Sequence, residues 1–190
     1  LLEITRKKAD FSDPESVRQS VLDAEADVII NAAAYTAVDQ AEHEPYAADL
    51  VNHQSVRALA EASQYKGNLL VHYSTDFVFD GKKKSSYQEN DATIPLGVYG
   101  STKLKGEQSI IKSGCKYIII RTSWVYSVYG RNFVKTILKL AKERGEIKVV
   151  DDQRGVPTSA RQIARTTRLL LESINLDDWV SEVYHLTAEG

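Results

Sequence analysis

The sequence predicts an α/β protein built on a doubly wound parallel sheet. Short apolar runs of strand length alternate along the chain with amphipathic segments of helix length, the pattern of strands joined by crossover helices. The run 27–31 is apolar almost throughout, as in parallel strands that are covered on both faces. No internal repeat or low-complexity tract interrupts this alternation.

The expected elements follow one another in strict order. Strands are expected at residues 1–5, 27–31, 69–74, 117–120, 147–150 and 183–186. Helices are expected at about 14–23, 47–64, from about 98, and at about 132–144 and 159–174. The first helix begins in one of two ways: Asp13 caps it with Pro14 in the first helical position, or Ser12 and Glu15 form a capping box. The residues expected along one side of the later helices are Val56, Leu59, Ala60 and Ser63, then Val134, Ile137, Leu138 and Ala141, then Ile163, Thr167, Leu170, Leu171 and Ile174.

Composition excludes several classes of partner. The 24 Lys and Arg residues face 26 Asp and Glu residues, and the short basic run 82–84 is expected to be a solvated loop, so neither nucleic acid nor an anionic membrane is indicated. No apolar run approaches the ~20 residues of a membrane span. A single cysteine, Cys115, fits a reducing cytoplasm. The four histidines and Cys115 lack metal-ligand spacing, although a bound Mg²⁺ is left open.

Tyr99 and Lys103 lie four residues apart at the start of an expected helix. Positions with this spacing share a helix face, so the phenol and the ammonium point into the same space. An ammonium beside a phenol favours the phenolate, and we expect Lys103 to lower the pKa of Tyr99 from its usual value near 10. Tyr99 is therefore a candidate proton donor to a carbonyl, and Lys103 can also form a hydrogen bond with a ribose. Surface helices carry the same pair by chance.

Ligands of parallel α/β sheets bind at the carboxyl ends of the strands, so the residues at those ends are candidate site residues. Residues 32–34, after the second strand, are three alanines that allow a flat ligand to approach, although tight strand-to-helix packing explains them equally well. Thr75 and Asp76, after the third strand, can bond and orient a substrate oxygen or form an ordinary turn. Trp124, after the fourth strand, either stacks on a sugar or packs in the core.

Taken together, these segments resemble the extended short-chain dehydrogenase/reductase superfamily in its nucleotide-sugar-modifying branch, and within it the dTDP-4-dehydrorhamnose reductase family. The resemblance covers essentially the whole chain and is carried by the runs 31–39, 72–79, 95–103, 121–126, 130–136 and 151–158. Nucleotide-sugar 4,6-dehydratases are similar but carry Thr-Asp-Glu where this chain has Thr75, Asp76 and Phe77. Since water elimination needs that glutamate, a reductase is the better interpretation.

The resemblance implies reduction of the C4 keto group of dTDP-4-dehydro-L-rhamnose to dTDP-L-rhamnose, with hydride from NADPH or NADH. It makes Tyr99 the proton donor, has Lys103 lower the pKa of Tyr99 and hold the nicotinamide ribose, and places Thr75 near the reacting oxygen. The further cofactor contacts that it implies are Asp10, Phe11, Ala34, Tyr35, Thr36 and Tyr73. The further substrate contacts that it implies are Asp76, Trp124, Asn132 and Gln153.

Two of these contacts have an alternative structural explanation, and a basic run bears on the choice of cofactor. Asp10 precedes a helix start and is equally explained as a complement to the helix dipole. Asn132 is equally explained as the cap of the helix that follows it. The basic run 6–8, just past the first expected strand, lies where a 2′-phosphate would bind and favours NADPH.

The resemblance also implies a division of the chain. Residues 1–124 would form an incomplete NAD(P)-binding domain, 125–160 the substrate-binding elements, and 161–190 a helix and strand that return to the first domain. The Gly-rich pyrophosphate loop of the family and the strand before it are not among these residues, so we expect about thirty further residues before Leu1 and more chain after Gly190. We expect these 190 residues alone to fold poorly and to bind no NAD(P)H.

Two other functions stay open at this point. One is a reductase or epimerase of the same branch that acts on another nucleotide sugar. The other is a non-catalytic regulatory subunit of the same fold, against which the intact Tyr99, Lys103 and Thr75 argue. The expected partner is a nucleotide-sugar substrate, in the cytoplasm, and a homodimer is among the assemblies that the sequence allows.

Overall fold

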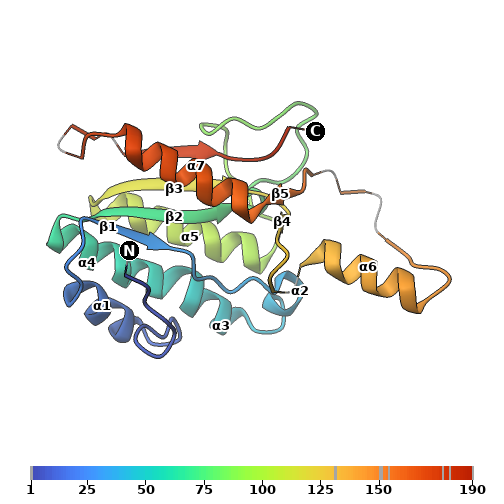
Figure 1. Cartoon of the computed structure of the whole chain (residues 1–190), viewed down its shortest axis with the longest axis horizontal. Coiled ribbons are helices and arrows are strands. Elements are labelled where there is room, and N and C mark those ends of the chain that lie inside the picture. Colours follow the sequence, from blue (N-terminus) through green and yellow to red (C-terminus); the bar gives the residue numbers. More distant parts are fainter. Residues whose placement is uncertain are drawn as a thin grey trace. The chain divides into compact units, whose positions relative to one another are not determined.

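The computed structural model describes residues 2–130, 132–149, 152–153, 155–176, 178–179 and 181–189. The chain divides into two compact units, Leu1–Arg121 with Leu176–His185, and Thr122–Asn175 with Leu186–Gly190. The first unit holds a sheet in the order β1-β2-β3-β6. Its strands are β1 (Val28–Asn31), β2 (Leu69–Thr75), β3 (Lys116–Thr122) and β6 (Glu182–His185). β1 runs parallel to β2, and β3 runs parallel to β6, which confirms the predicted α/β class (Figure 1).

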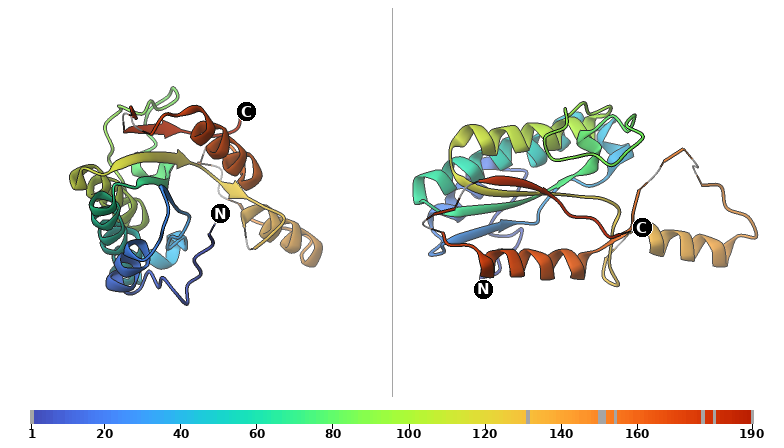
Figure 2. Two further views of the ribbon diagram at one scale, coloured as in Figure 1. Left: turned by 60° about the vertical axis from the view of Figure 1, so that its left-hand side comes forward. Right: turned by 90° about the horizontal axis from the view of Figure 1, so that it is seen from above.

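Three helices of the first unit cover one face of this sheet. They are α1 (Pro14–Leu22), α4 (Ser55–Lys66) and α5 (Val98–Ser113), and they lie side by side (Figures 1 and 2). The core between helices and sheet is formed by Val17, Val21, Val56, Leu59, Ala60, Ala62, Leu70, Ile110, Cys115 and Ile119. The side predicted to face inward on α4 is therefore buried, Ser63 included. Asp13 caps α1 by accepting from the Glu15 amide, with Pro14 first in the helix, so the first of the two predicted starts is the one found.

The helix that leads into α4 contains a π turn. After α2 (Val38–Ala41), the chain runs through α3 (Pro45–Asp49) and the π turn η1 (Leu50–Gln54) directly into α4. In η1 the Ser55 amide donates to the carbonyl of Leu50, five residues back. Mid-helix π turns of this kind are frequent at functional sites.

The second unit holds the elements from β4 to α7. β4 (Val125–Tyr126) pairs in parallel with β5 (Thr158–Ser159), and the helices are α6 (Phe133–Glu143) and α7 (Ala160–Ser173). The predicted inward side of α7 is anchored by Ile163 and Thr167, which are buried. Within α6 no side chain is buried, and Leu138 is 58% exposed. The apolar side predicted for α6 thus faces solvent within its own unit.

Two predicted strands are not found. Residues 2–5 have no strand structure, and Leu2 is 66% exposed. The carbonyl of Thr5 instead accepts from the amides of Lys8 and Ala9, which closes a turn. Residues 147–149 are also irregular, while residues 1 and 150 lie outside the described part of the chain. Both runs are apolar enough for a strand, but no described strand pairs with either, and unpaired backbone gains nothing from extension.

Within the described residues, no helix is long and apolar enough to cross a membrane. The same residues contain no group of three or more His, Cys, Asp or Glu side chains placed to hold a metal ion.

Candidate functional site

β2 delivers two of the predicted site residues where it ends. Thr75 is its last residue, and the Thr75 hydroxyl oxygen accepts from the Phe77 amide at 3.2 Å and so caps the 3₁₀ turn η2 (Asp76–Val78). The same hydroxyl lies 3.1 Å from Oδ1 of Asp76, to which it donates. Burial raises the pKa of Asp76. The hydroxyl that caps the turn therefore also belongs to the candidate site, and two hydrogen bonds orient it.

The start of α5 lies directly against η2. Gly97 is the N-cap of α5, and Tyr99 is in its first turn. A Cβ added to Gly100 would lie 2.2 Å from the carbonyl oxygen of Phe77, so only glycine allows this close approach. The rings of Phe77 and Tyr99 meet edge to face with centroids 5.6 Å apart. The Tyr99 side chain is thereby fixed beside Thr75.

The environment of Tyr99 differs from the sequence prediction. Burial raises the pKa of its phenol, and the negative charge of Asp76 raises it further, while a hydrogen bond with Thr75 lowers it in part. The predicted lowering of the Tyr99 pKa by Lys103 is wrong, because the ammonium of Lys103 is directed to other partners. The phenol is consequently held in its protonated, proton-donating form at neutral pH.

Lys103 is buried beneath the site, with 2% of its surface exposed. Its Nζ donates to the carbonyl of Tyr73 at 2.6 Å and lies 3.3 Å from Nε2 of His72. Burial lowers the pKa of Lys103 to about 8, against an opposing effect of the Glu107 carboxylate. Lys103 is thus a lysine whose ammonium releases its proton at a much lower pH than an ordinary lysine does.

A buried polar chain continues from Lys103 into the sheet. His72, fully buried in β2, lies with Nδ1 3.0 Å from Nδ2 of Asn31, its register partner at the end of β1. Burial, together with the nearby charge of Lys103, lowers the pKa of His72 well below its ordinary value. Sequence reasoning did not single out Asn31 or His72. The signal available was their position at or near the carboxyl ends of two neighbouring strands.

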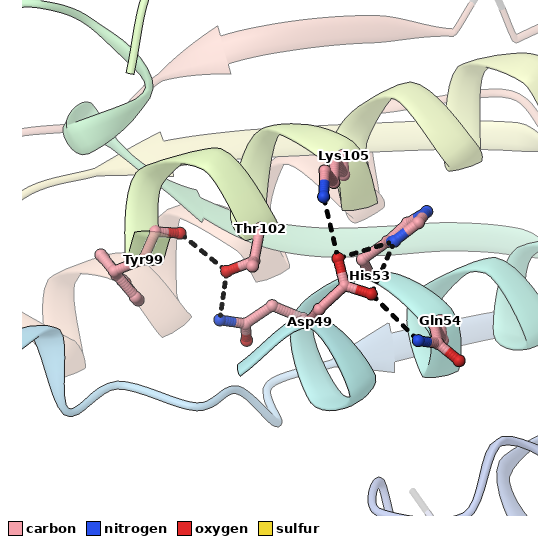
Figure 3. A network of polar contacts seen from close by, with 7 residues as sticks. Asp49, His53, Gln54, Tyr99, Thr102 and Lys105 are labelled. Carbon is pink, nitrogen blue, oxygen red and sulfur yellow. Dashed lines mark hydrogen bonds and ion pairs between the residues drawn. The ribbon is translucent and has the colours of Figure 1, made fainter. Parts of the chain in front are cut away.

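Asn52, in the π turn, ties the loop after β1 to α5. Its Oδ1 accepts from the Tyr35 amide at 2.9 Å, and its Nδ2 donates to the Tyr35 carbonyl and to Thr102 Oγ1. Thr102 in turn donates to the carbonyl of Tyr99 at 2.9 Å (Figure 3). Beside this network Asp49 accepts from Lys105 at 3.1 Å. Asn52 was not predicted as a site residue, and the sequence signal for it was an asparagine inside an expected helix.

The remaining predicted cofactor contacts lie in two loops of the first unit. Asp10 Oδ1 accepts from the amide and hydroxyl of Ser12, and these bonds lower the pKa of Asp10. The Phe11 carbonyl accepts from Ser55 at 2.8 Å. In the loop after β1, the Tyr35 hydroxyl donates to Glu44 at 2.7 Å, which raises the pKa of Tyr35. Ala34 and Thr36 flank Tyr35 in this loop.

The predicted substrate contacts Trp124, Asn132 and Gln153 belong to the second unit. Trp124 has a positive φ of 43°, rare for a residue with a side chain, and its indole lies where a Cβ on Gly155 would fall within 2.6 Å. Asn132 caps α6, with Oδ1 accepting from the Lys135 amide at 3.1 Å. Gln153 is exposed, and its neighbour Arg154 lies outside the described residues.

The whole chain is similar to proteins of one family. A sequence profile described as "RmlD substrate binding domain" matches residues 1–190. A dTDP-4-dehydrorhamnose reductase of Burkholderia thailandensis is 47% identical over 98% of this chain and 64% of that protein. Another of that name, from Escherichia coli K12, is 49% identical over 95% of this chain and 60% of that protein.

A solved structure gives the same similarity in three dimensions. The crystal structure of dTDP-4-dehydrorhamnose reductase from Bacillus anthracis in complex with NADP matches with a TM-score of 0.89 and 40% identity. The match covers 98% of this chain and 65% of that one. The chain therefore spans less than two thirds of the length of these relatives.

Proposed function

This chain belongs to the family of the RmlD substrate binding domain, and from that premise we propose that it reduces the C4 keto group of dTDP-4-dehydro-L-rhamnose to dTDP-L-rhamnose. The hydride comes from NADPH or NADH. One observation carries the proposal: Tyr99, Thr75 and Asp76 converge where α5 meets the end of β2, and Lys103 lies beneath them on the same helix.

The residues present fit a dinucleotide at this place. Nζ of Lys103 donates to the Tyr73 carbonyl and contacts His72, and no other described group accepts from it, so an N–H is left for a ribose hydroxyl. The buried hydroxyl of Ser74 has no described partner. Tyr35, Ala34, Thr36, Asp10 and Phe11 would hold the rest of the cofactor, which supplies the hydride when bound.

Tyr99 has the properties of the proton donor. Its phenol is protonated because burial and Asp76 raise its pKa. As hydride reaches the carbonyl carbon, negative charge develops on the carbonyl oxygen, and a phenol hydrogen-bonded there can deliver its proton. The single hydrogen of the Thr75 hydroxyl, which Asp76 accepts in this structure, would turn to the same oxygen, and Asp76 orients the sugar. Because these donors are in place before the reaction begins, they stabilise the negative charge as it develops.

Phe77 distinguishes a reductase from a dehydratase. Phe77 is 38% exposed, and its ring packs edge to face against Tyr99. A hydrocarbon ring at this position can neither add nor remove the proton that water elimination requires. The position favours simple reduction at C4.

The substrate side of the proposal involves Trp124, Asn132 and Gln153. The indole of Trp124, half-buried against Gly155, can line a sugar pocket. Asn132 is already engaged as a helix cap, which reduces the groups that it can offer a nucleotide. Gln153 is exposed and free to reach one.

The proposed activity is tested by incubating the full-length protein with dTDP-4-dehydro-L-rhamnose and either NADPH or NADH. Loss of absorbance from the reduced cofactor, together with formation of dTDP-L-rhamnose, is the expected result. Arg6 and Lys7, on the exposed turn before α1, favour the faster reaction with NADPH. Cofactor binding without turnover would instead indicate a regulatory subunit, and turnover of another nucleotide sugar alone would change the substrate.

We further propose a cytoplasmic location and a homodimer. The cytoplasm is supported by Cys115, which is buried and free. A second copy is supported by the exposed apolar side chains of α6, Phe133 and Leu138 among them. Light scattering on the full-length protein measures the assembly directly.

A further inference from the structure

A continuous buried chain of polar contacts ends on Lys103. Asn31 lies at the end of β1, His72 opposite it in β2, and Lys103 on α5, with exposed fractions of 4%, 0% and 2%. The Asn31 amide contacts the His72 ring at 3.0 Å, and the ring contacts Lys103 Nζ at 3.3 Å. Polar groups this deep in a sheet need a reason, because leaving them imperfectly paired destabilises the fold.

The hydrogen bonds fix the tautomer of His72. The Ala33 backbone amide, which can only donate, bonds to Oδ1 of Asn31 at 3.0 Å. The other end of the Asn31 side chain, which faces the ring, is therefore the donating Nδ2. Nδ1 of His72 must accept from it. A neutral imidazole whose Nδ1 accepts carries its hydrogen on Nε2.

The Nε2–H of His72 consequently points at Lys103. An ammonium has only donors, so a charged Lys103 places two donors against each other across 3.3 Å. A neutral amine has a lone pair that accepts from Nε2–H, while one of its own hydrogens still donates to the Tyr73 carbonyl. The chain of hydrogen bonds is therefore complete only when Lys103 has released a proton.

We propose that Asn31 and His72 are positioning residues that lower the proton affinity of Lys103 and so hold it ready to exchange a proton at the site. Asn31 acts by setting the tautomer of His72, and His72 acts by presenting a donor to Lys103. The catalytic use of this proton rests on the proposed reductase function. The effect on Lys103 itself does not.

The other charged and titratable groups around Lys103 do not supply this effect. Glu107, one turn further along α5, opposes it by favouring the ammonium. That carboxylate is itself neutralised by Arg121 of β3 at 2.7 Å. From η2, Asp76 acts on Tyr99, the neighbour of Lys103 one turn back on α5. Burial also lowers the pKa of Lys103. The variants below separate this effect from the proposed effect of His72, because they leave burial unchanged.

Titration of Lys103 by NMR tests the proposal without an activity assay. The full-length protein is labelled with ¹³C-lysine, the Lys103 signal is identified by its loss in Lys103→Arg, and its ε-carbon shift is followed through the alkaline range. In His72→Gln the side-chain oxygen can replace Nε2–H and accept from the ammonium. In Asn31→Asp both carboxylate oxygens accept, so His72 must carry its hydrogen on Nδ1 and accept from Lys103 at Nε2.

The expected result is a wild-type Lys103 pKa of about 8, as burial indicates, and a pKa higher by about one pH unit or more in each variant. His72→Gln adds no charge, so its effect is free of the attraction that Asn31→Asp introduces. His53→Gln, at a histidine bonded to Asp49 in η1, is the control and should leave the Lys103 pKa as it is.

Three results overturn the inference: a wild-type pKa at the ordinary value for lysine, a wild-type pKa retained in folded His72→Gln, or one retained in folded Asn31→Asp. If His72→Gln does not fold, the Lys103 pKa in Asn31→Asp decides the question, since Asn31→Asp leaves the His72 ring in place. A protein with the expected titrations but no reductase activity contradicts the proposed function and leaves this inference standing. Reductase turnover in a protein whose variants leave the Lys103 pKa unchanged supports the proposed function and contradicts this inference.

Discussion

Tyr99 and Lys103 lie one turn apart on α5 and yet serve different neighbours. The phenol lies beside Thr75 and Asp76, whereas the ammonium bonds the backbone of β2. Their pKa values therefore shift in opposite directions, that of Tyr99 upward and that of Lys103 downward. Groups whose environments separate their proton affinities are suited to acid and base work.

Removing the Tyr99 hydroxyl tests its assignment as the acid. In Tyr99→Phe we expect kcat to fall roughly 10²–10⁴-fold, the usual contribution of a positioned general acid. The ring still packs against Phe77, so cofactor and substrate binding should persist. Steady-state kinetics and cofactor titration measure both quantities. Tyr65→Phe, at a residue 81% exposed, is the control. Turnover above about a tenth of wild type in Tyr99→Phe would remove Tyr99 from the role of acid.

Burial of Lys103 should leave a signature in the pH dependence of stability. Its pKa is about 8 in the folded protein and near 10.5 in the unfolded chain. Between these values the unfolded chain binds the extra proton, so the free energy of unfolding due to Lys103 rises as the pH rises. Below pH 8 the folded protein carries a buried ammonium that destabilises it.

Lys103→Met should therefore be more stable than wild type at pH 7, by about 1–3 kcal/mol, and should lack the rise between pH 8 and 10.5. Urea unfolding at several pH values measures both effects. Lys112→Met, at an exposed position of the same helix, controls for loss of an ordinary lysine. Equal pH dependence in wild type and Lys103→Met would show that the ammonium is not destabilised by burial.

At the scale of elements, two glycines set how closely α5 approaches its neighbours. A Cβ on Gly100 would lie 2.2 Å from the Phe77 carbonyl oxygen, and a Cβ on Gly106 2.3 Å from that of Asn52. In both cases the obstacle is backbone, which cannot turn aside as a side chain does. Helix propensity favours alanine at both positions, so packing has overruled it.

Gly100→Ala should separate α5 from η2 and destabilise the protein by about 1–3 kcal/mol, in the range of other overpacked sites. Because Tyr99 and Thr75 stand on the two separated elements, kcat should fall as well. Thermal unfolding and kinetics measure the two effects. Gly145→Ala is the control, since nothing lies within 4 Å of its added Cβ. An unchanged melting temperature in Gly100→Ala would mean that the contact is looser than the structure has it.

For the whole molecule, Arg121 connects parts of the chain that are far apart in sequence. It pairs with Glu107 of α5 at 2.7 Å, donates to the Glu89 carbonyl at 3.2 Å, and lies 3.5 Å from His185 of β6. Its guanidinium also lies over the Phe79 ring at 5.2 Å. The last strand and the loop after η2 are thereby joined to the centre of the sheet.

Arg121→Met should destabilise the protein by about 3–5 kcal/mol, because it leaves the Glu107 carboxylate buried without its partner. Adding Glu107→Met should recover much of this loss, since two apolar groups of similar size need no partner. Urea unfolding of wild type, both single variants and the double variant measures the coupling. Additive losses in the double variant would show that the ion pair contributes little. Arg168→Met, which removes one partner of an exposed ion pair on α7, serves as the control.

Sequence reasoning reached the fold class and most elements because their signals are local. The Asp13–Pro14 start of α1 and the buried side of α4 follow from capping and periodicity, and both were found. The strand expected at the N-terminus failed because pairing, which a single run cannot reveal, decides whether an apolar run becomes a strand. The direction of the Tyr99 pKa failed for a related reason: helical spacing places Lys103 near Tyr99 but does not say where its ammonium is bonded.

The π turn η1 has a consequence for chain length. A turn closed by the Ser55-to-Leu50 bond contains one residue more than an α-turn, so η1 holds one residue beyond what a regular α-helix would place there. Deleting Val51 should let α3 and α4 join as one regular helix with their buried sides still in register. The residue displaced would be Asn52, which holds Tyr35 and Thr102. A shortened protein that folds but loses cofactor affinity is the expected result, and one that binds as wild type would assign the extra residue no functional part.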